Sequence, residues 1–231
     1  FTYDERGRYA GREIEVANAL FTLIEPGKQA TLYFITGTSG SGKSSFAQAG
    51  LLPALEEHYT KRNQTLRLLP IIHPGDNPKL RIADALSLIG AQDIGRLNRA
   101  QAEPAVLVLD QFEEFFTQSP PDQRTQVFAQ LAALPLFAQS HLHIIATLRS
   151  DYLRELYDHK ELWQISKQGT ELRAMSEDAL KQAIQRPLQS RAEVDGRYTG
   201  KRFEPGLVNL LAKQTSPDPA DLWVRHYAFR T

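Results

Sequence analysis

The sequence predicts an α/β fold in which helices cover both faces of a parallel β-sheet. Three observations support this class. Apolar, β-branched stretches alternate with segments of helical periodicity, as they do in proteins built from β-α-β units. The segment 104–109 is continuously apolar, which is typical of a strand buried on both faces of a parallel sheet. A glycine-rich loop also joins the first such stretch to a helix.

The first β-α unit surrounds that loop. The stretch 31–36 is β-branched and aromatic and predicts a strand, and 44–59 predicts a helix with its large apolar residues on one side. Residues 37–44 between them fit the phosphate-binding pattern G-x-x-x-x-G-K-[ST]. Glycines let backbone N–H groups surround phosphates, the lysine reaches the outer phosphates, and the serine hydroxyl binds Mg²⁺. The predicted nucleotide ligands are Gly37, Thr38, Ser39, Gly40, Ser41, Gly42, Lys43, Ser44 and Ser45.

The remaining elements complete the predicted sheet. Apolar segments predict the next three strands: 66–72, 104–109 and 142–148. Helical periodicity predicts the intervening helices: 79–89, 111–117, 122–138 and 150–159. A fifth strand is expected at one of two places, 162–166 or 169–174. Because strands alternate with helices, the sheet is expected to be parallel.

Beyond residue 175 the strand pattern ends. Ser176 is a favourable N-cap and predicts a helix to about Gln185, and Glu204 opens another through Lys213. We therefore expect three parts: an N-terminal segment and helix over 1–30, a phosphate-loop core over 31–175, and a small helical lid over 176–231 that we expect to be truncated. Since the chain begins at Phe1, we expect it to be a segment of a longer protein.

Composition excludes several classes of protein. The chain has 231 residues, 42% of them hydrophobic, which suffices for a packed core and a small second domain. Lysine plus arginine and aspartate plus glutamate both number 27, so no overall positive charge favours nucleic acid. No apolar run approaches the roughly 18 residues of a membrane span. The absence of cysteine excludes disulfides and thiolate metal sites and is typical of a cytoplasmic protein, and the histidines lack metal-ligand spacing.

Acidic residues follow the third predicted strand. Asp110 stands where phosphate-loop enzymes place a second Mg²⁺ ligand, so Ser44 and Asp110 are the predicted metal-binding pair. The next position often holds a glutamate that orients the attacking water, but here it is Gln111, and an amide is a poor base. Either Glu113 or Glu114 takes that role, or hydrolysis is expected to be slow. The alternative is that both form an ordinary acidic helix start.

Arg149 ends the fourth predicted strand. An arginine there can reach a γ-phosphate, because its planar guanidinium stays charged and pairs with phosphate oxygens. The alternative is a surface ion pair with Asp151. The predicted catalytic set is Lys43, Asp110, Glu113, Glu114 and Arg149.

Seven short motifs occur along the chain. They are Gly11-Arg12-Glu13, residues 37–45, Ala49-Gly50-Leu51-Leu52-Pro53, Pro74-Gly75-Asp76-Asn77-Pro78, Asp110-Gln111-Phe112-Glu113-Glu114, Thr147-Leu148-Arg149-Ser150-Asp151 and Ala183-Ile184-Gln185-Arg186-Pro187. In this order they resemble the STAND class of P-loop ATPases, signal-transduction ATPases with numerous domains. The resemblance covers residues 9 to 211 and is closest to a bacterial branch often joined to β-propeller repeats or protease-like effectors. Beyond the predicted lid, the chain matches the pattern of this family only at residues 221–223.

The resemblance implies an ATP- and Mg²⁺-dependent switch, alternating between ATP and ADP, within a larger signalling or defence protein. Its implied partners are the nucleotide, flanking sensor and effector domains, and further copies in a nucleotide-dependent homo-oligomer. It also implies that Gly11 and Arg12 lie beside the adenine and that Pro187 of the lid contacts the nucleotide. From the residues alone, a plain helix start is the alternative for Gly11 and Arg12.

Two other functions remain open. A small-molecule kinase needs an acceptor pocket with several arginines, for which Arg149, Arg154 and Arg173 are candidates. An interaction module would bind ADP tightly and seldom turn over. A GTPase is disfavoured because the guanine-reading motif N-K-x-D is absent.

Overall fold

The centre of the molecule is a five-stranded parallel sheet with the strand order β2-β3-β4-β1-β5. The computed structural model describes residues 1–24, 32–94, 103–134, 142–194 and 196–213. The strands are β1 (Leu32–Gly37), β2 (Arg67–Leu68), β3 (Ala105–Leu109), β4 (Leu142–Arg149) and β5 (Thr170–Leu172). The predicted α/β class and the parallel sheet are therefore confirmed. The third and fourth strands are neighbours, so the residues that end them lie at the same edge.

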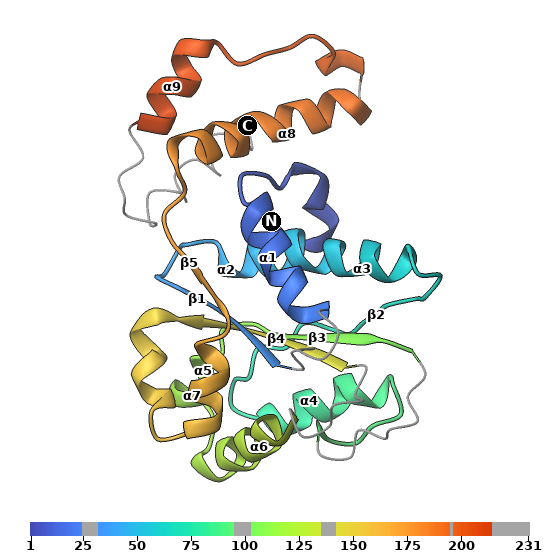
Figure 1. Ribbon diagram of the computed structural model, residues 1–231, viewed down its shortest axis with the longest axis vertical. Helices are drawn as coiled ribbons and strands as arrows, with labels where there is room; N and C mark the ends of the chain where they lie inside the picture. The colour runs from blue at the N-terminus through green and yellow to red at the C-terminus, as the bar shows by residue number, and fades with distance from the viewer. Residues whose placement is uncertain (25–31, 95–102, 135–141, 195, 214–231) are drawn as a thin grey trace.

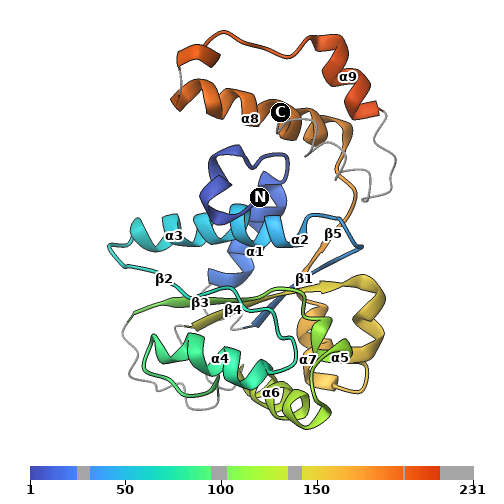
Figure 2. The same ribbon diagram turned by 180° about the vertical axis from the view of Figure 1, so that it is seen from behind.

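Helices form a layer on each face of this sheet (Figures 1 and 2). One layer contains α1 (Glu13–Ile24), α2 (Lys43–Ser45), the π-helical segment η2 (Phe46–Leu51) and α3 (Leu52–Thr60). The other contains α4 (Pro78–Ser87), α5 (Glu114–Thr117), α6 (Pro121–Ala133), the 3₁₀ helix η5 (Ser150–Leu156) and α7 (Lys160–Ser166). Alternate residues of β1 enter the two cores, Phe34 on the α4–α7 side and Ile35 on the α1–α3 side.

Beyond β5 the chain continues into the segment that the sequence predicts to be a helical lid, which is called the lid below. It consists of α8 (Glu177–Val194), a 3₁₀ turn (Gly196–Tyr198) and α9 (Pro205–Lys213). The Ser176 hydroxyl caps α8 by accepting a hydrogen bond from the backbone N–H of Ala179 at 3.2 Å. The N-terminal 3₁₀ helix η1 (Tyr3–Arg8) packs between α8 and the α2–α3 layer, so the lid rests on the N-terminal segment (Figure 1). None of the described helices is long and apolar enough to cross a membrane.

Four predicted elements have different bounds in the structure. The second strand is reduced to Arg67–Leu68, followed by an isolated bridge from Ile72 to Leu109. The fifth strand occupies the second of the two expected places, 169–174. The first place, 162–166, belongs to helix α7, on which Leu162 and Ser166 are buried one turn apart. The helix expected over 150–159 is a shorter 3₁₀ helix. Of the stretch 111–117, only its last four residues, α5, form a helix.

The lid helix α8 extends further than the sequence predicts. The sequence predicts that this helix ends at about Gln185. Instead α8 continues to Val194 with Pro187 inside it. Packing against η1 on one side and α9 on the other offsets the hydrogen bond that the proline cannot donate. The segment 215–231, which the sequence assigned to the lid, lies outside the described residues.

Candidate nucleotide-binding site

The phosphate loop connects β1 to α2 at the carboxyl end of the sheet. Gly40 and Gly42 have φ angles of 75° and 87°, which only glycine adopts readily, so the loop can turn twice within three residues. Lys43 is buried, and its ammonium donates hydrogen bonds to the carbonyl oxygens of Gly37 at 3.1 Å and Thr38 at 2.8 Å. Burial lowers the pKa of Lys43, while the neighbouring Glu113 carboxylate opposes that shift. The charge is thus held inside the loop, next to the carboxylates predicted from the sequence.

A buried carboxylate joins this loop to the two central strands. Asp110 follows β3, and its Oδ1 accepts a hydrogen bond from the Ser44 hydroxyl at 2.8 Å. The same oxygen accepts a bond from the Thr147 hydroxyl of β4 at 2.6 Å. The backbone N–H of Gln111 donates to the Thr147 hydroxyl at 2.9 Å and lies 3.2 Å from the Asp110 oxygen. The structure therefore brings the predicted metal pair together and adds Thr147, for which the sequence predicted no role beyond its place in a motif.

The donors at this point suit a hard divalent cation. Ser44 supplies a hydroxyl oxygen and Asp110 a carboxylate, and Mg²⁺ is usually held by one or two such protein groups together with substrate phosphates. Within the described residues, no cluster of three or more histidine, aspartate or glutamate side chains could hold a metal by protein ligands alone. The arrangement fits an ion that is shared with a phosphate ligand.

The two glutamates after Asp110 point to different places. Gln111 has a φ of 57°, and the turn sends Phe112 into the core against Phe34. Beyond it, the Glu113 carboxylate accepts a hydrogen bond from the backbone N–H of Arg149 at 3.3 Å. The Glu114 carboxylate instead accepts one from the backbone N–H of Gly75 at 3.0 Å, in the turn before α4. Only Glu113 therefore faces the end of β4 and the loop lysine.

Arg149 forms the surface ion pair that was the alternative to a phosphate contact. Its guanidinium binds both carboxylate oxygens of Asp151, at 3.1 and 2.6 Å, and lies 5.4 Å from the centre of the Tyr152 ring. The hydrogen bonds from Arg149 lower the pKa of the Asp151 carboxyl. The Arg149 side chain is 38% exposed, and its charge contributes to lowering the pKa of Lys43, so it lies near the loop.

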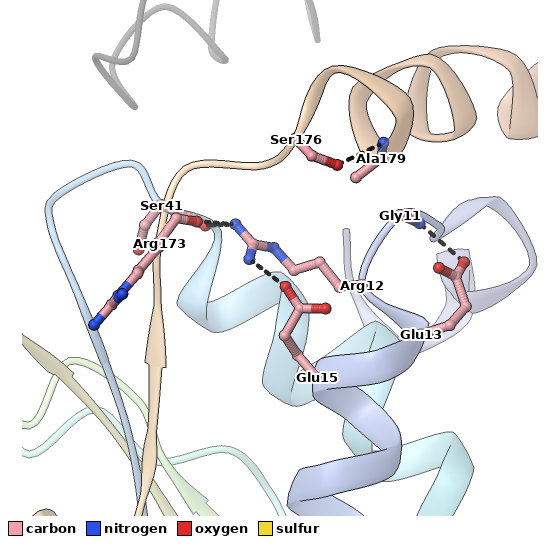
Figure 3. Close-up of polar contacts among 8 residues, drawn as sticks. All are labelled: Gly11, Arg12, Glu13, Glu15, Ser41, Arg173, Ser176 and Ala179. Carbon is pink, nitrogen blue, oxygen red and sulfur yellow. Dashed lines mark hydrogen bonds and ion pairs between the residues drawn. The ribbon is translucent and has the colours of Figure 1, made fainter.

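Gly11 and Arg12 lie between the loop and the lid (Figure 3). Arg12 is 3% exposed and donates hydrogen bonds to the backbone oxygens of Ser41 and Arg173. Gly11 has a φ of 90°, and a Cβ there would lie 2.4 Å from the carbonyl oxygen of Ala179. Pro187 stands two turns further along α8, about 12 Å from Ala179 along the helix axis. Ser190, close to Pro187 on α8, lies against Gly7 of η1, whereas Ala179 in the first turn of α8 lies against Gly11.

Comparisons with known proteins identify the family of this chain. The family model described as Novel STAND NTPase 1 matches residues 1–230. The chain belongs to this STAND NTPase family. The resemblance drawn from the seven motifs is thereby confirmed. No curated protein sequence matches the chain.

Solved structures show the same P-loop ATPase fold. The Aeropyrum pernix ORC2 protein in its ADPNP–ADP complexes has a TM-score of 0.59 and 15% sequence identity, over 87% of this chain and 56% of that chain. Cdc6p from Pyrobaculum aerophilum has a TM-score of 0.56 and 18% identity, over 91% and 56%. The A. pernix ORC1 protein in complex with DNA has a TM-score of 0.58 and 17% identity, over 94% and 59%. This STAND domain therefore spans little more than half the length of each neighbour.

Proposed function

We propose that this STAND domain binds Mg²⁺-ATP, hydrolyses it to ADP, and acts as a nucleotide-driven switch. The observation that carries the proposal is the hydrogen bond between Ser44 and Asp110 beside the buried Lys43. A lysine, a hydroxyl and a carboxylate converge where a glycine-rich loop meets a helix, at the carboxyl end of a parallel sheet. These are the groups that a triphosphate and its magnesium ion require.

Binding would change the partners of these groups. The Lys43 ammonium now donates to two loop carbonyls and would turn toward the outer phosphates, which offer it full negative charges. Ser44 and Asp110 would hold Mg²⁺, which neutralises charge on the phosphate oxygens. Thr147 and the Gln111 N–H hold Asp110 in place before the ligand arrives, so little rearrangement is needed.

Glu113 is the residue that we propose to orient the attacking water. Its carboxylate lies at the end of β4 and affects the pKa of Lys43, whereas Glu114 is committed to the Gly75 turn. A carboxylate can hold water and accept its proton, which the Gln111 amide does poorly. Arg149 would leave Asp151 and pair with the γ-phosphate, so that ATP and ADP produce different states.

The switch would act through the lid. We propose the three-part division 1–30, 31–175 and 176–231, with adenine on the side of Gly11 and with Pro187 as a lid contact to the nucleotide. In this proposal the domain works in the cytoplasm, within a larger signalling or defence protein whose flanking sensor and effector domains and homo-oligomeric partners respond to the nucleotide. A kinase is less well supported, because Arg154 and Arg173 are exposed and pair with the nearby glutamates Glu155 and Glu171.

The test compares the two glutamates. Wild-type protein should release phosphate from ATP in the presence of Mg²⁺ without any acceptor. Glu113→Gln should lower kcat by about 100-fold while ATP still binds, since positioned bases contribute factors of this order. Glu114→Gln is the matched control and should retain most of the activity, because the amide oxygen can still accept the hydrogen bond from the Gly75 N–H, only without the charge that strengthens it.

The possible results separate the candidate functions. Equal kcat values for Glu113→Gln and wild type would remove Glu113 from the mechanism. Phosphate transfer that requires an added acceptor would favour a kinase. Tight ADP binding without phosphate release would favour an interaction module.

A further inference from the structure

We propose that Arg12 is a positioning residue that ties the phosphate loop to the root of the lid, the segment 173–176 between β5 and α8. It acts on the nucleotide through these two segments, and its guanidinium does not read the adenine base. The inference rests on the proposed function, because it concerns how the same site binds phosphates.

The contacts of Arg12 come from three separate parts of the chain (Figure 3). Its Nη2 donates to the backbone oxygen of Ser41 in the loop at 3.2 Å and to that of Arg173 at 2.9 Å. Its Nη1 donates to the Glu15 carboxylate at 3.2 Å. The side chain is 3% exposed, and a buried guanidinium needs such partners to offset its lost hydration. Turning toward a base would break these contacts.

The bond to Ser41 fixes one peptide of the phosphate loop. Ser41 stands between Gly40 and Gly42, which have positive φ angles and, because they lack a Cβ, allow the backbone to take several directions. In a planar trans peptide the carbonyl and the N–H point in opposite directions. When Arg12 holds the Ser41 carbonyl, the Gly42 N–H therefore points away from Arg12. Phosphates bind to such loop N–H groups, so Arg12 helps to orient a donor that it does not touch.

The bond to Arg173 fixes the chain as it leaves the sheet for the lid. The backbone oxygens of Ser41 and Arg173 accept hydrogen bonds from the same nitrogen, Nη2 of Arg12. A movement of the loop at Ser41 that shifts this nitrogen therefore changes its hydrogen bond to Arg173. The adjacent Gly11 strengthens this coupling, because it packs directly on the Ala179 carbonyl in the first turn of α8. Phosphate in the loop and the position of the lid are thereby linked through two consecutive residues.

The experiment uses a ligand with phosphates but no base. Affinities for Mg²⁺-ATP and for Mg²⁺-tripolyphosphate are measured by calorimetry for wild type and Arg12→Ala. The tie predicts that both affinities fall by the same factor, about tenfold, because charge-assisted hydrogen bonds to the loop are lost. It also predicts faster hydrogen exchange over residues 173–180 in the ATP-bound variant, since the root of the lid is released.

Three further variants complete the test. Arg12→Lys keeps the charge, but one ammonium cannot reproduce the several N–H donors of the guanidinium, so the affinities for ATP and tripolyphosphate should again fall by equal factors. This variant replaces Arg12→Ala if the alanine variant folds poorly. Arg173→Ala should behave as wild type, because Arg12 binds the backbone oxygen and not the exposed side chain. Arg8→Ala removes a partly exposed arginine of the same N-terminal segment and should also have no effect.

Two results would overturn the tie. A loss confined to ATP, with tripolyphosphate affinity unchanged, would make Arg12 a base-reading residue. Unchanged hydrogen exchange at 173–180 in both Arg12 variants would show that the lid does not depend on this contact. Failure of the wild type to bind either ligand is a separate result, since it overturns the proposed function before any variant is compared.

Discussion

The two sides of the proposed phosphate site are built in different ways. On the metal side, one buried carboxylate oxygen of Asp110 accepts hydrogen bonds from the hydroxyls of Ser44 and Thr147. On the γ-phosphate side, Arg149 and Asp151 form an ion pair whose side chains are 38% and 56% exposed. The first side is part of the core between β3 and β4, and the second stands in contact with solvent.

This difference suggests a division of labour. Buried hydrogen bonds in a low-dielectric surrounding are costly to break, so the metal side is held in one geometry. An exposed ion pair contributes about 0 to 1 kcal/mol, so Arg149 can exchange Asp151 for a phosphate at little cost. The rigid side is suited to binding both ATP and ADP, and the exchangeable side is suited to distinguishing them.

The largest expected effect is at Lys43, which both sides share. Lys43→Ala removes the cation that the loop holds for the phosphates, so we expect ATP and ADP affinities to fall by about 100-fold, the order of a charge-assisted contact. Calorimetric titration of both nucleotides measures this, with circular dichroism to establish that the variant folds. Undiminished binding by a folded variant would remove the phosphate loop from the proposal.

An intermediate effect is expected at Thr147 on the rigid side. Thr147→Val keeps the shape but removes the hydroxyl that holds Asp110, leaving the Gln111 N–H with a poorer partner. We expect a stability loss of about 1–3 kcal/mol, the cost of an unsatisfied buried group. We also expect a roughly tenfold loss of ATP affinity with Mg²⁺ and a smaller one in EDTA, because Asp110 is the proposed metal ligand.

The reference for that measurement is Asp110→Asn, which removes the charge of the proposed metal ligand itself. Asp110→Asn should reduce the difference between the ATP affinity measured with Mg²⁺ and that measured in EDTA further than Thr147→Val does. If Thr147→Val lowers the ATP affinity equally with Mg²⁺ and in EDTA, Thr147 stabilises the fold around Asp110 but does not contribute to metal binding.

The sequence predicted the central elements of the fold well because their patterns are local. β3 is apolar throughout, β4 is mostly apolar and almost entirely buried, and the glycine pattern marks the loop after β1. Elements that depend on distant packing were predicted less well. The stretch 162–166 was one of two places expected for a strand, but it lies in helix α7, which buries Leu162 and Ser166 one turn apart. α8 passes Pro187 because η1 and α9 pack against it.

The residues of the candidate site also differ in how far the sequence could predict them. Residue types and spacing pointed to Ser44 and Asp110, whose contact the structure shows. The choice between Glu113 and Glu114 could not come from sequence, because it depends on where the turn after Gln111 aims each side chain. The role of Arg12 could not either, since its bond to Arg173 spans 161 positions and is made to a backbone oxygen that any residue could supply.

The smallest expected effect is at Arg149 on the exchangeable side. Arg149→Ala should leave the stability within about 1 kcal/mol of wild type, because the pair with Asp151 is exposed and screened by solvent. ATP affinity should fall about fivefold and ADP affinity should stay unchanged, since only ATP offers a γ-phosphate to the guanidinium. Arg154→Ala is the matched control: it removes an exposed arginine paired with Glu155, in the 3₁₀ helix that directly follows Arg149. Titrating ATP and ADP against the three proteins decides the matter, because a surface ion pair has no means of telling the nucleotides apart. Equal changes for ATP and ADP, or the same ATP loss in Arg154→Ala, would leave Arg149 as a surface pair and would place nucleotide discrimination elsewhere in the site.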